Sequence, residues 1–379
     1  MQIACSINKE YIPHMCAMLL SAYQNTSVGK LNVHVLHADL DEKDQCKIID
    51  EFTKYERLSL HFYEIDQSIL NGIPIVAEHL SVETLYRLLM PIVLPNKVEK
   101  ILYIDSDIII KNDLLKVWNE KIEEHYIAAV VNLEERMYKI LELNSPMDYF
   151  NAGFMLINLK KWRENDFLNV CLNYVRKNID KIIFADQDIL NGVLKGNWKR
   201  LHPMWNVISG VVWNKKMFEE YFDLATYENI INNPSVIHYT GLIKPWHINS
   251  EHYFKKEYYI YANQLSWRKD LPIGMKELKH SDLYLFGTGV YSLKVTNILN
   301  NLGIRLLGYL DNDKAKWNGL FENKPIFKPD NILLKHYERK VIIIIASSFE
   351  SEILQKIHRE YKLDSYMNVI RFSDLHTIK

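Results

Sequence analysis

The chain has few of the residues that mark a disulfide-rich or zinc-binding protein. Its four cysteines, Cys5, Cys16, Cys46 and Cys171, lie far apart among 379 residues, and no two form a C-x-x-C pair. Such spacing argues against a structural zinc site and against the disulfide framework of a secreted protein. A reducing cytoplasm is the simplest setting. We therefore expect a cytoplasmic protein and keep open its placement at the inner face of the membrane.

Long apolar runs and an excess of one charge are also missing. An apolar run such as residues 341–346 is far too short to span a bilayer, and the first ten residues lack the basic stretch and apolar core of a signal peptide. The net charge of −1 gives no electrostatic basis for binding nucleic acid. Residues 267–269, Trp-Arg-Lys, could touch a membrane surface, but three residues are too few to establish peripheral membrane contact.

The rest of the composition is that of a globular protein with a large core. Apolar residues make up 48% of the chain and charged residues 25%. A chain of 379 residues corresponds to two or three domains. We expect the stretch Asp-Leu-Pro-Ile-Gly at residues 270–274 to link a domain over residues 1–270 to a smaller one over residues 280–379.

Strand and helix patterns alternate along the first domain. Strands are expected at residues 2–6, 31–36 and 58–65, and helices at residues 11–23, 42–55 and 82–89, the last stopped by Pro91. This order predicts an α/β fold with a mostly parallel, doubly wound sheet. Further strands are expected up to residue 162, with turn-like residues 151–153 between them.

The stretch KILYIDSDIIIK, residues 100–111, places two carboxylates within a run of strand-forming residues. In extended backbone Asp105 and Asp107 would point to the same face, with roughly 6.6 Å between their Cα atoms at about 3.3 Å per residue. Two ionised carboxylates that close repel one another unless a positive group lies beside them. A hard divalent cation such as Mn²⁺ or Mg²⁺ would suit them. The alternative, a strand that ends at Ile104 in a solvated Asp-Ser-Asp turn, stays open.

Together with three further segments, this motif resembles glycosyltransferase family 8. The four segments, in the order found in the family, are YIDSDIII (103–110), FNAGFMLINLKKW (150–162), ADQDILNG (185–192) and IHYTGLIKPW (237–246). The resemblance covers roughly residues 1–250. It implies a nucleotide-diphospho-sugar transferase fold of the GT-A type. It also implies transfer of glucose or galactose from a UDP-sugar donor with retention of the anomeric configuration.

The resemblance implies roles for the metal-binding and phosphate-binding residues. Asp105, Asp107 and His238 would hold Mn²⁺ or Mg²⁺ against the donor diphosphate, with Asp105 also near the ribose. Lys244 and the backbone of Gly241 would bind the diphosphate. The ammonium group of the lysine would offset the negative charge that grows on the diphosphate as it leaves the sugar. Without the resemblance, we would interpret His238 as a histidine packed within a strand and Lys244 as a solvated lysine in a loop.

The resemblance also assigns residues to the donor sugar. Arg87 matches an arginine that contacts donor phosphate and sugar, although a surface ion pair explains it equally well. Asn151 and Ala152 would approach the donor sugar, and a plain tight turn explains them almost as well. Asp186 and Gln187 match the positions that face the sugar hydroxyls and its reactive face, where catalysis occurs. Taken alone, Asp186 reads as a helix N-cap.

The sequence departs from the family at two positions. Asn8 is retained near the N-terminus, but Ser6 stands where the family usually shows an acidic residue beside the uracil and ribose. Asn132 takes the place of an Asp, and its amide can bond a sugar hydroxyl but cannot act as a base. Both departures leave the selectivity for uridine and the effect on activity open.

A glycine turn in the second domain is typical of nucleotide binding. Gly287 and Gly289 follow an expected strand and open a helix, and Asp311 ends the next strand, 22 residues beyond Gly289. This offset suits a dinucleotide fingerprint in a small Rossmann-like domain, although Ser292 replaces the third glycine. Nucleotide binding and a docking or structural role both stay open.

The combined motifs predict a divalent-metal-dependent, retaining hexosyltransferase. Its acceptor would be a glycan or glycolipid, such as a lipooligosaccharide, a capsule or a glycoprotein glycan. Front-face substitution is favoured, and a covalent intermediate on Asp186 is the alternative. Two rival interpretations remain: a sugar-nucleotide-binding protein that has lost turnover, and a bifunctional protein with a dinucleotide-binding tail.

Overall fold

A computed structural model describes residues 1–75, 81–242, 244–247, 250–266, 275–334, 340–347, 349–361 and 367–372. The chain divides into two compact units, one of residues 1–245 and 252–269, the other of residues 246–251 and 270–379. The expected linker at residues 270–274 and the Trp-Arg-Lys stretch at residues 267–269 lie outside the described residues. Within those described ranges, none of the helices is long and apolar enough to cross a membrane.

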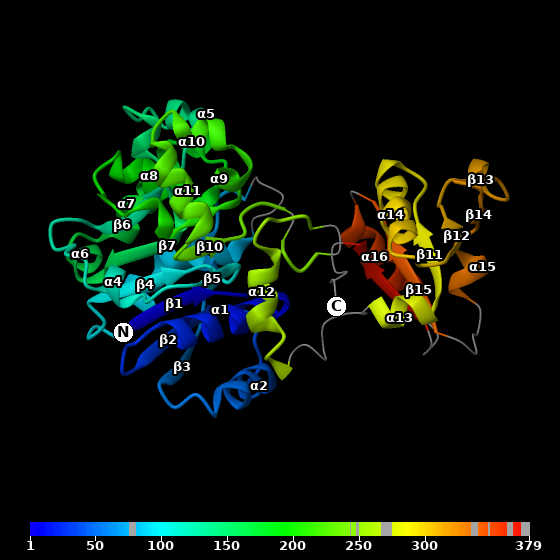
Figure 1. Ribbon diagram of the computed structural model, residues 1–379, viewed down its shortest axis with the longest axis horizontal. Helices are drawn as coiled ribbons and strands as arrows, with labels where there is room; N and C mark the ends of the chain where they lie inside the picture. The colour runs from blue at the N-terminus through cyan, green and yellow to red at the C-terminus, as the bar shows by residue number, and fades with distance from the viewer. Residues whose placement is uncertain are drawn as a thin grey trace. The chain divides into compact units, whose positions relative to one another are not determined.

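The first unit contains a seven-stranded sheet in the order β3-β2-β1-β4-β7-β6-β8. Figure 1 labels these strands from β3 to β6. Its strands are β1 (Gln2–Ser6), β2 (Leu31–His37), β3 (Leu58–Glu64), β4 (Lys100–Ile104), β6 (Ile127–Val131), β7 (Phe150–Asn158) and β8 (Lys199–Arg200). β1 pairs in parallel with β2 and β4, β2 with β3, and β6 with β8, whereas β7 is antiparallel to both β4 and β6. The expected α/β fold with a mostly parallel sheet is confirmed.

The central strands are apolar on both faces, and helices cover them. β1 and β4 bury every residue after their first, as expected for parallel strands between two layers of helix. The helices of this unit are α1 (Ile12–Asn25), α2 (Glu42–Phe52), α3 (Met90–Val93), α4 (Leu115–Trp118), α5 (Glu135–Ile140), α6 (Leu159–Glu164), α7 (Phe167–Lys177), α8 (Ala185–Leu194), α9 (Ser209–Trp213), α10 (Lys215–Glu219), α11 (Leu224–Asn232) and α12 (Lys255–Ala262).

Two local expectations are wrong. The helix expected at residues 82–89 is present as a 3-10 helix, but Pro91 does not stop it, because Pro91 lies in the first turn of α3, where its missing N–H is not needed. Residues 151–153 form no turn but lie inside β7. The pairing of β6 with β7 shifts register between Ala129 and Val130, which lets the extended strand absorb the Asn-Ala-Gly sequence.

A second sheet of the first unit consists of β5 (Ile108–Ile110), β10 (Val236–His238) and β9 (Val207–Ile208), with β10 in the middle. β10 runs antiparallel to β5, and the register pairs His238 with Ile108. The backbone N–H of Tyr239 donates to the carbonyl of Asp107 over 3.0 Å. This short sheet therefore fixes residue 238 beside residue 107, although about 130 positions separate them in the sequence.

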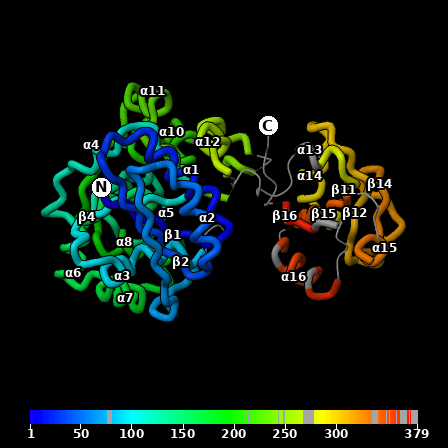
Figure 2. The backbone as a smooth tube through the Cα atoms, turned by 90° about the horizontal axis from the view of Figure 1, so that it is seen from below, coloured from blue at the N-terminus to red at the C-terminus, as the bar shows by residue number. Residues whose placement is uncertain are grey.

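The second unit is an α/β sheet domain with the strand order β13-β14-β12-β11-β15-β16. Its elements are α13 (Met275–His280), β11 (Asp282–Phe286), α14 (Val290–Asn301), β12 (Leu306–Leu310), β13 (Leu320–Phe321), β14 (Lys324–Phe327), α15 (Asp330–Leu333), β15 (Val341–Ile345), α16 (Glu350–Glu360) and β16 (Met367–Arg371). Alternate residues of β15 belong to two apolar clusters, one with α14 and the other with α16. These helices therefore cover opposite faces of the sheet (Figure 2).

Candidate active site

A cavity of about 490 Å³ opens where β1 and β4 end, the position at which open α/β sheets bind ligands. All twelve residues of the first unit for which the sequence predicted a binding, metal or catalytic role line it. They are Asn8, Arg87, Asp105, Asp107, Asn132, Asn151, Ala152, Asp186, Gln187, His238, Gly241 and Lys244. Segments far apart in the sequence thus meet in one cavity, and the roles predicted for these residues stay predictions.

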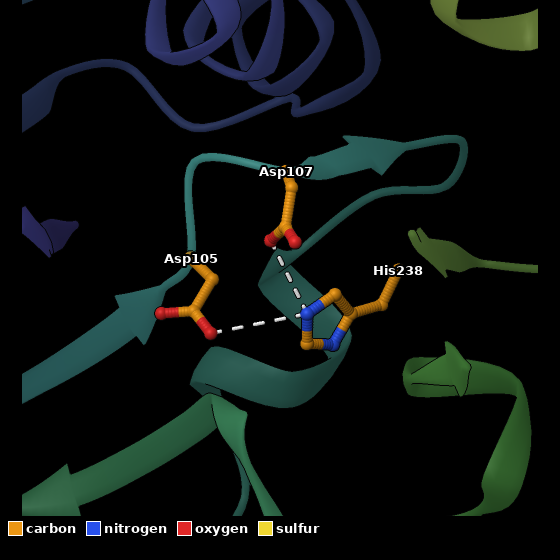
Figure 3. A group of neighbouring side chains, drawn as sticks. All are labelled: Asp105, Asp107 and His238. Carbon is orange, nitrogen blue, oxygen red and sulfur yellow. Dashed lines mark ion pairs between the residues drawn. The ribbon is translucent and has the colours of Figure 1, made fainter. Parts of the chain in front are cut away.

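Three potential metal ligands converge in this cavity (Figure 3). The Nε2 atom of His238 lies 3.2 Å from Oδ1 of Asp107 and 3.8 Å from Oδ2 of Asp105. One ligand atom from each residue lies within 4.8 Å of the other two. Two carboxylates and an imidazole at such distances fit a divalent cation such as Mn²⁺ or Mg²⁺.

The backbone at the two aspartates matches neither sequence interpretation completely. β4 ends at Ile104, so the Asp-Ser-Asp sequence is a turn rather than a continuous strand. Its carboxylates are nevertheless largely withdrawn from solvent, since 26% of the Asp105 side chain and 11% of the Asp107 side chain are exposed. The turn therefore presents both acids to the cavity instead of to bulk water.

Lys244 neutralises Asp107 in the buried part of the site. Its ammonium lies 2.5 Å from Oδ2 of Asp107 and donates to the carbonyl of Tyr239 over 2.7 Å. Burial alone would raise the pKa of Asp107, but Lys244 and His238 together bring the pKa well below its usual range. Burial likewise lowers the pKa of Lys244, and the carboxylate of Asp107 more than reverses that effect. Lys244 is thus a buried cation, and the solvated-loop interpretation is wrong.

Arg87 links two acidic residues of the cavity. Its Nη2 donates to Oδ1 of Asp105 over 2.8 Å, and its Nε lies 3.0 Å from Oδ2 of Asp186. Another N–H of the guanidinium donates to the carbonyl of Ala152, and the group stacks 4.2 Å from the ring centroid of Tyr103. Only 3% of the side chain is exposed, so the alternative of a surface ion pair is wrong.

Asp186 lies inside the first turn of α8 and does not cap it, because Phe184 occupies the N-cap position. Its carboxylate is buried beside Arg87. Burial raises the pKa of Asp186 to about 7, against the opposing effect of the arginine. This residue can therefore change its protonation state near neutral pH.

Gln187 and residues 151–152 meet through one amide oxygen. Oε1 of Gln187 accepts from Nδ2 of Asn151 and from the backbone N–H of Ala152, both over 3.0 Å.

Two further predicted residues line the cavity. The side chain of Asn8 accepts a hydrogen bond from the backbone N–H of Tyr11 over 3.2 Å. Gly241 has a φ of +88°, a conformation that glycine adopts without strain.

Sequence reasoning missed three buried residues behind the cavity. The amide oxygen of Asn206 lies 3.0 Å from Nδ1 of His238, and the hydroxyl of Tyr149 donates to Oδ1 of Asp188 over 2.7 Å. The acidic residue in the segment ADQD that follows Gln187 was the one available signal. Nothing in the sequence pointed to Asn206 or Tyr149.

In the second unit, Gly287, Gly289 and Asp311 line a common cavity at the ends of β11 and β12. Asp311 accepts from the hydroxyl of Thr288 and lies 3.0 Å from the ammonium of Lys316. Ser292, which replaces the third glycine, is buried and donates to the carbonyl of Gly287 over 2.8 Å. Nucleotide binding and the Rossmann-like assignment of this unit stay predictions.

Comparison with known proteins decides the family. Residues 2–250, about two thirds of the chain, match the family model described as Glycosyl transferase family 8. The chain belongs to glycosyl transferase family 8. It is therefore a glycosyltransferase, as its four motif segments predicted. Residues 280–367 match a second model, described as C2185-like, N-terminal.

Two curated relatives align over most of their length. General stress protein A of Bacillus subtilis is 25% identical over 272 residues, which cover 70% of this chain and 94% of that protein. A lipopolysaccharide 1,2-glucosyltransferase of Escherichia coli is 27% identical over 292 residues, which cover 74% of this chain and 84% of the relative. The family 8 assignment thus rests on long alignments at modest identity.

Solved structures support the expected fold. The galactosyltransferase LgtC, solved in complex with donor and acceptor sugar analogues, superimposes with a TM-score of 0.64 at 24% identity and covers 72% of this chain and all of the other. At this identity the likeness concerns the fold. The GT-A type of sheet expected of a family 8 enzyme is thereby confirmed.

Proposed function

We propose that the chain is a retaining hexosyltransferase that moves glucose or galactose from a UDP-sugar to a glycan or glycolipid acceptor. The observation that carries this proposal is the convergence of Asp105, Asp107 and His238 in the same cavity as Asp186 and Gln187. Relatives named as a lipopolysaccharide glucosyltransferase and a galactosyltransferase support the choice of sugars. A lipooligosaccharide, capsule or glycoprotein glycan is the proposed acceptor class.

Asp105, Asp107 and His238 are the proposed holders of Mn²⁺ or Mg²⁺. Their donor set suits a hard cation, and the Nδ1 atom of His238 is engaged by Asn206, so Nε2 faces the two carboxylates. When bound, the cation would offset negative charge on the diphosphate that leaves the sugar.

The protein supplies two further positive charges to the donor. Lys244 pairs with Asp107, and the ammonium can exchange part of that interaction for a donor phosphate once Asp107 has another cationic partner. Arg87 is held by Asp105 and Asp186 in the same cavity, where a guanidinium can contact phosphate and sugar oxygens. Both cations are buried, which strengthens their attraction for a diphosphate.

Asp186 and Gln187 are the proposed residues for the donor sugar. An amide and a carboxyl group can bond sugar hydroxyls and fix the ring. In the proposed front-face substitution, the bond between the sugar and the diphosphate breaks as the acceptor oxygen forms the new bond, and the leaving phosphate takes the acceptor proton. The buried position of Asp186 beside Arg87 favours this route over a covalent intermediate, because the arginine engages its carboxylate.

The first experiment measures UDP release from a panel of UDP-sugars with Mn²⁺, without acceptor. We compare the wild type with Asp107→Ala and with Asp180→Ala, an exposed aspartate that serves as the matched control. Metal-dependent release from one sugar nucleotide, lost in Asp107→Ala and kept in Asp180→Ala, supports the proposal and names the donor.

If no UDP-sugar is hydrolysed, calorimetry with UDP and Mn²⁺ separates the remaining possibilities. Metal-dependent binding of UDP would indicate an obligatory acceptor or a binding protein without turnover, the rival that Ser6 and Asn132 leave open. Absence of binding would refute the proposal. The bifunctional rival, with a dinucleotide-binding tail, predicts that NAD binds and that Asp311→Ala weakens this binding.

A further inference from the structure

Six polar side chains form a continuous hydrogen-bonded chain, three of them in the lining of the cavity and three buried behind it. It begins on α8, crosses to β7 and ends on β10, and its members in order are Asp188, Tyr149, Gln187, Asn151, Asn206 and His238. The successive contacts measure 2.7, 2.8, 3.0, 2.8 and 3.0 Å. Asp188 and Asn206 are buried, and so are Tyr149, Asn151 and His238.

The hydrogen-bonded chain has one direction and starts at Asp188, whose two carboxyl oxygens both accept hydrogen bonds. Oδ2 of Asp188 accepts from the backbone N–H groups of Ile183 and Phe184 over 2.7 and 2.6 Å, and Oδ1 accepts from the hydroxyl of Tyr149. Burial raises the pKa of Tyr149 well above its ordinary value, so the hydroxyl keeps its proton. The oxygen of Tyr149 must then accept from Nε2 of Gln187.

Backbone donors fix the two amides in the middle of the chain independently. The N–H of Ala152 requires an oxygen from Gln187, and the N–H of Gly153 requires an oxygen from Asn151, each over 3.0 Å. The NH₂ group of Asn206 donates to the oxygen of Asn151 over 2.8 Å. The remaining oxygen of Asn206 therefore faces Nδ1 of His238, which must carry a proton.

With one proton fixed on Nδ1, any second proton of the ring is on Nε2, and its loss leaves the lone pair on Nε2. That lone pair lies 3.2 Å from Oδ1 of Asp107 and 3.8 Å from Oδ2 of Asp105. Once Nε2 has lost its proton, these three electron-rich atoms repel one another unless another cation replaces that proton among them. The hydrogen-bonded chain thus prepares the histidine as a ligand before any cation binds.

We propose that Asp188, Tyr149 and Asn206 are positioning residues that fix the Nδ1–H tautomer of His238 and the orientation of Gln187 through one hydrogen-bonded chain. The inference rests on the proposed function and deepens it. The same series of hydrogen bonds then orients both the metal ligand His238 and Gln187, whose amide is proposed to face the donor sugar. Asn206 contacts the metal ligand His238, and this part of the hydrogen-bonded chain is called the metal end. Tyr149 contacts Gln187, and that part is called the sugar end.

The two ends give different expected effects. Asn206→Leu removes the acceptor for Nδ1 of His238, and outer partners of a metal-ligating histidine typically change metal affinity 10- to 100-fold. Asn206→Asp keeps an acceptor at that position and loses the donor to Asn151. Tyr149→Phe removes one oxygen atom and leaves Nε2 of Gln187 without its acceptor.

The experiment measures Mn²⁺ binding to the full chain by electron paramagnetic resonance without sugar nucleotide, and the tautomer of His238 by ¹⁵N NMR in the metal-free protein. We expect an Nδ1–H tautomer in the wild type, Mn²⁺ binding at least tenfold weaker in Asn206→Leu, and affinity within about threefold of wild type in Asn206→Asp. A wild-type Nε2–H tautomer, or equal Mn²⁺ affinity in Asn206→Leu, would overturn the inference.

Tyr149→Phe tests the other end, with Tyr258→Phe as its control. Tyr258 is also a buried tyrosine whose hydroxyl bonds a side chain, that of His14, away from the cavity. We expect Tyr149→Phe to lower kcat for transfer at least tenfold while Mn²⁺ affinity stays within about threefold, and Tyr258→Phe to leave both unchanged. Equal losses of kcat in the two variants would show a general packing effect and overturn this role.

The Mn²⁺ and tautomer measurements need no turnover, so the two proposals fail separately. A wild type that binds Mn²⁺ but transfers no sugar from any UDP-sugar contradicts the proposed function. The Mn²⁺ affinity of Asn206→Leu and the tautomer of His238 then still decide whether Asn206 is a positioning residue. A wild type that transfers sugar while Asn206→Leu keeps full Mn²⁺ affinity contradicts the positioning role alone.

Discussion

Gly153 lies directly behind His238, with no space for a side chain between them. A Cβ atom built on Gly153 would be 2.2 Å from Cε1 of the imidazole and 2.6 Å from Oδ2 of Asp105. The backbone of Gly153 also accepts from the N–H of Asp105 over 2.8 Å. The glycine is therefore required for close approach rather than for an unusual φ angle.

Gly153→Ala should displace His238 or Asp105 from the metal-ligand arrangement. Both contacts would fall well below van der Waals distance, and β7 is too deeply embedded in the sheet to move away. We expect Mn²⁺ affinity and transfer activity to fall by about a hundredfold, as for a lost ligand partner. Gly29→Ala, where an added Cβ meets no atom within 4 Å, is the control and should retain both. A Gly153→Ala variant with unchanged Mn²⁺ affinity would contradict the described packing.

Arg87 should be a major determinant of stability as well as of donor binding. Its guanidinium is the cationic partner of both Asp105 and Asp186, and removing one side of a buried pair leaves uncompensated charge. We expect Arg87→Met to lower the free energy of unfolding by about 3 kcal/mol. Urea denaturation measures this cost. The same substitution in an Asp186→Asn background should cost less, and equal costs in both backgrounds would show that the two residues are not coupled.

Stability should fall with rising pH because of Asp186. Its pKa is about 7 in the folded chain against 3.8 for the ordinary group, so the folded state binds more protons between these values. Ionisation then opposes folding by about 1.4 kcal/mol per pH unit in that window, and the contribution present below pH 4 is lost as pH rises through 7. Asp186→Asn removes the titrating group. The difference in unfolding free energy between Asp186→Asn and wild type should therefore rise by about 3 kcal/mol from pH 5 to pH 8. A difference that is independent of pH would show that Asp186 is ionised throughout.

Lys244 should compete with a metal for Asp107 and then assist the donor. Because the ammonium pairs with Asp107, Lys244→Met should leave Mn²⁺ affinity equal or higher when no nucleotide is present. With Mn²⁺ present, UDP affinity should fall at least tenfold, since a charge-assisted hydrogen bond contributes about 1.5–3 kcal/mol. Calorimetry gives both values. Lys216→Met, at an exposed position on α10, should change neither. Weaker Mn²⁺ binding in Lys244→Met would show that the lysine organises the acids rather than competing for them.

The sequence predicted the composition of the site better than its local backbone. Asp105, Asp107 and His238 were found because each stands in a recognisable segment of the first unit. The extended backbone expected for the two acids, the helix stop expected at Pro91 and the turn expected at residues 151–153 were wrong. Each of these depends on pairing with a distant strand or helix, which local pattern does not contain.

The sequence by itself determined the alternation of strands and helices, the resemblance to glycosyltransferase family 8 and twelve of the residues that line the first cavity. Apolar periodicity and motif order are local properties, so they can be read along the chain. Only the tertiary structure decided that Arg87 bridges two acids, that Lys244 is buried against Asp107, and that Asn206 orients His238. These relationships arise where β5 pairs with β10 and where the 3-10 helix of residues 82–89 meets α8. Burial at these contacts strengthens the ion pairs and hydrogen bonds that the side chains form there.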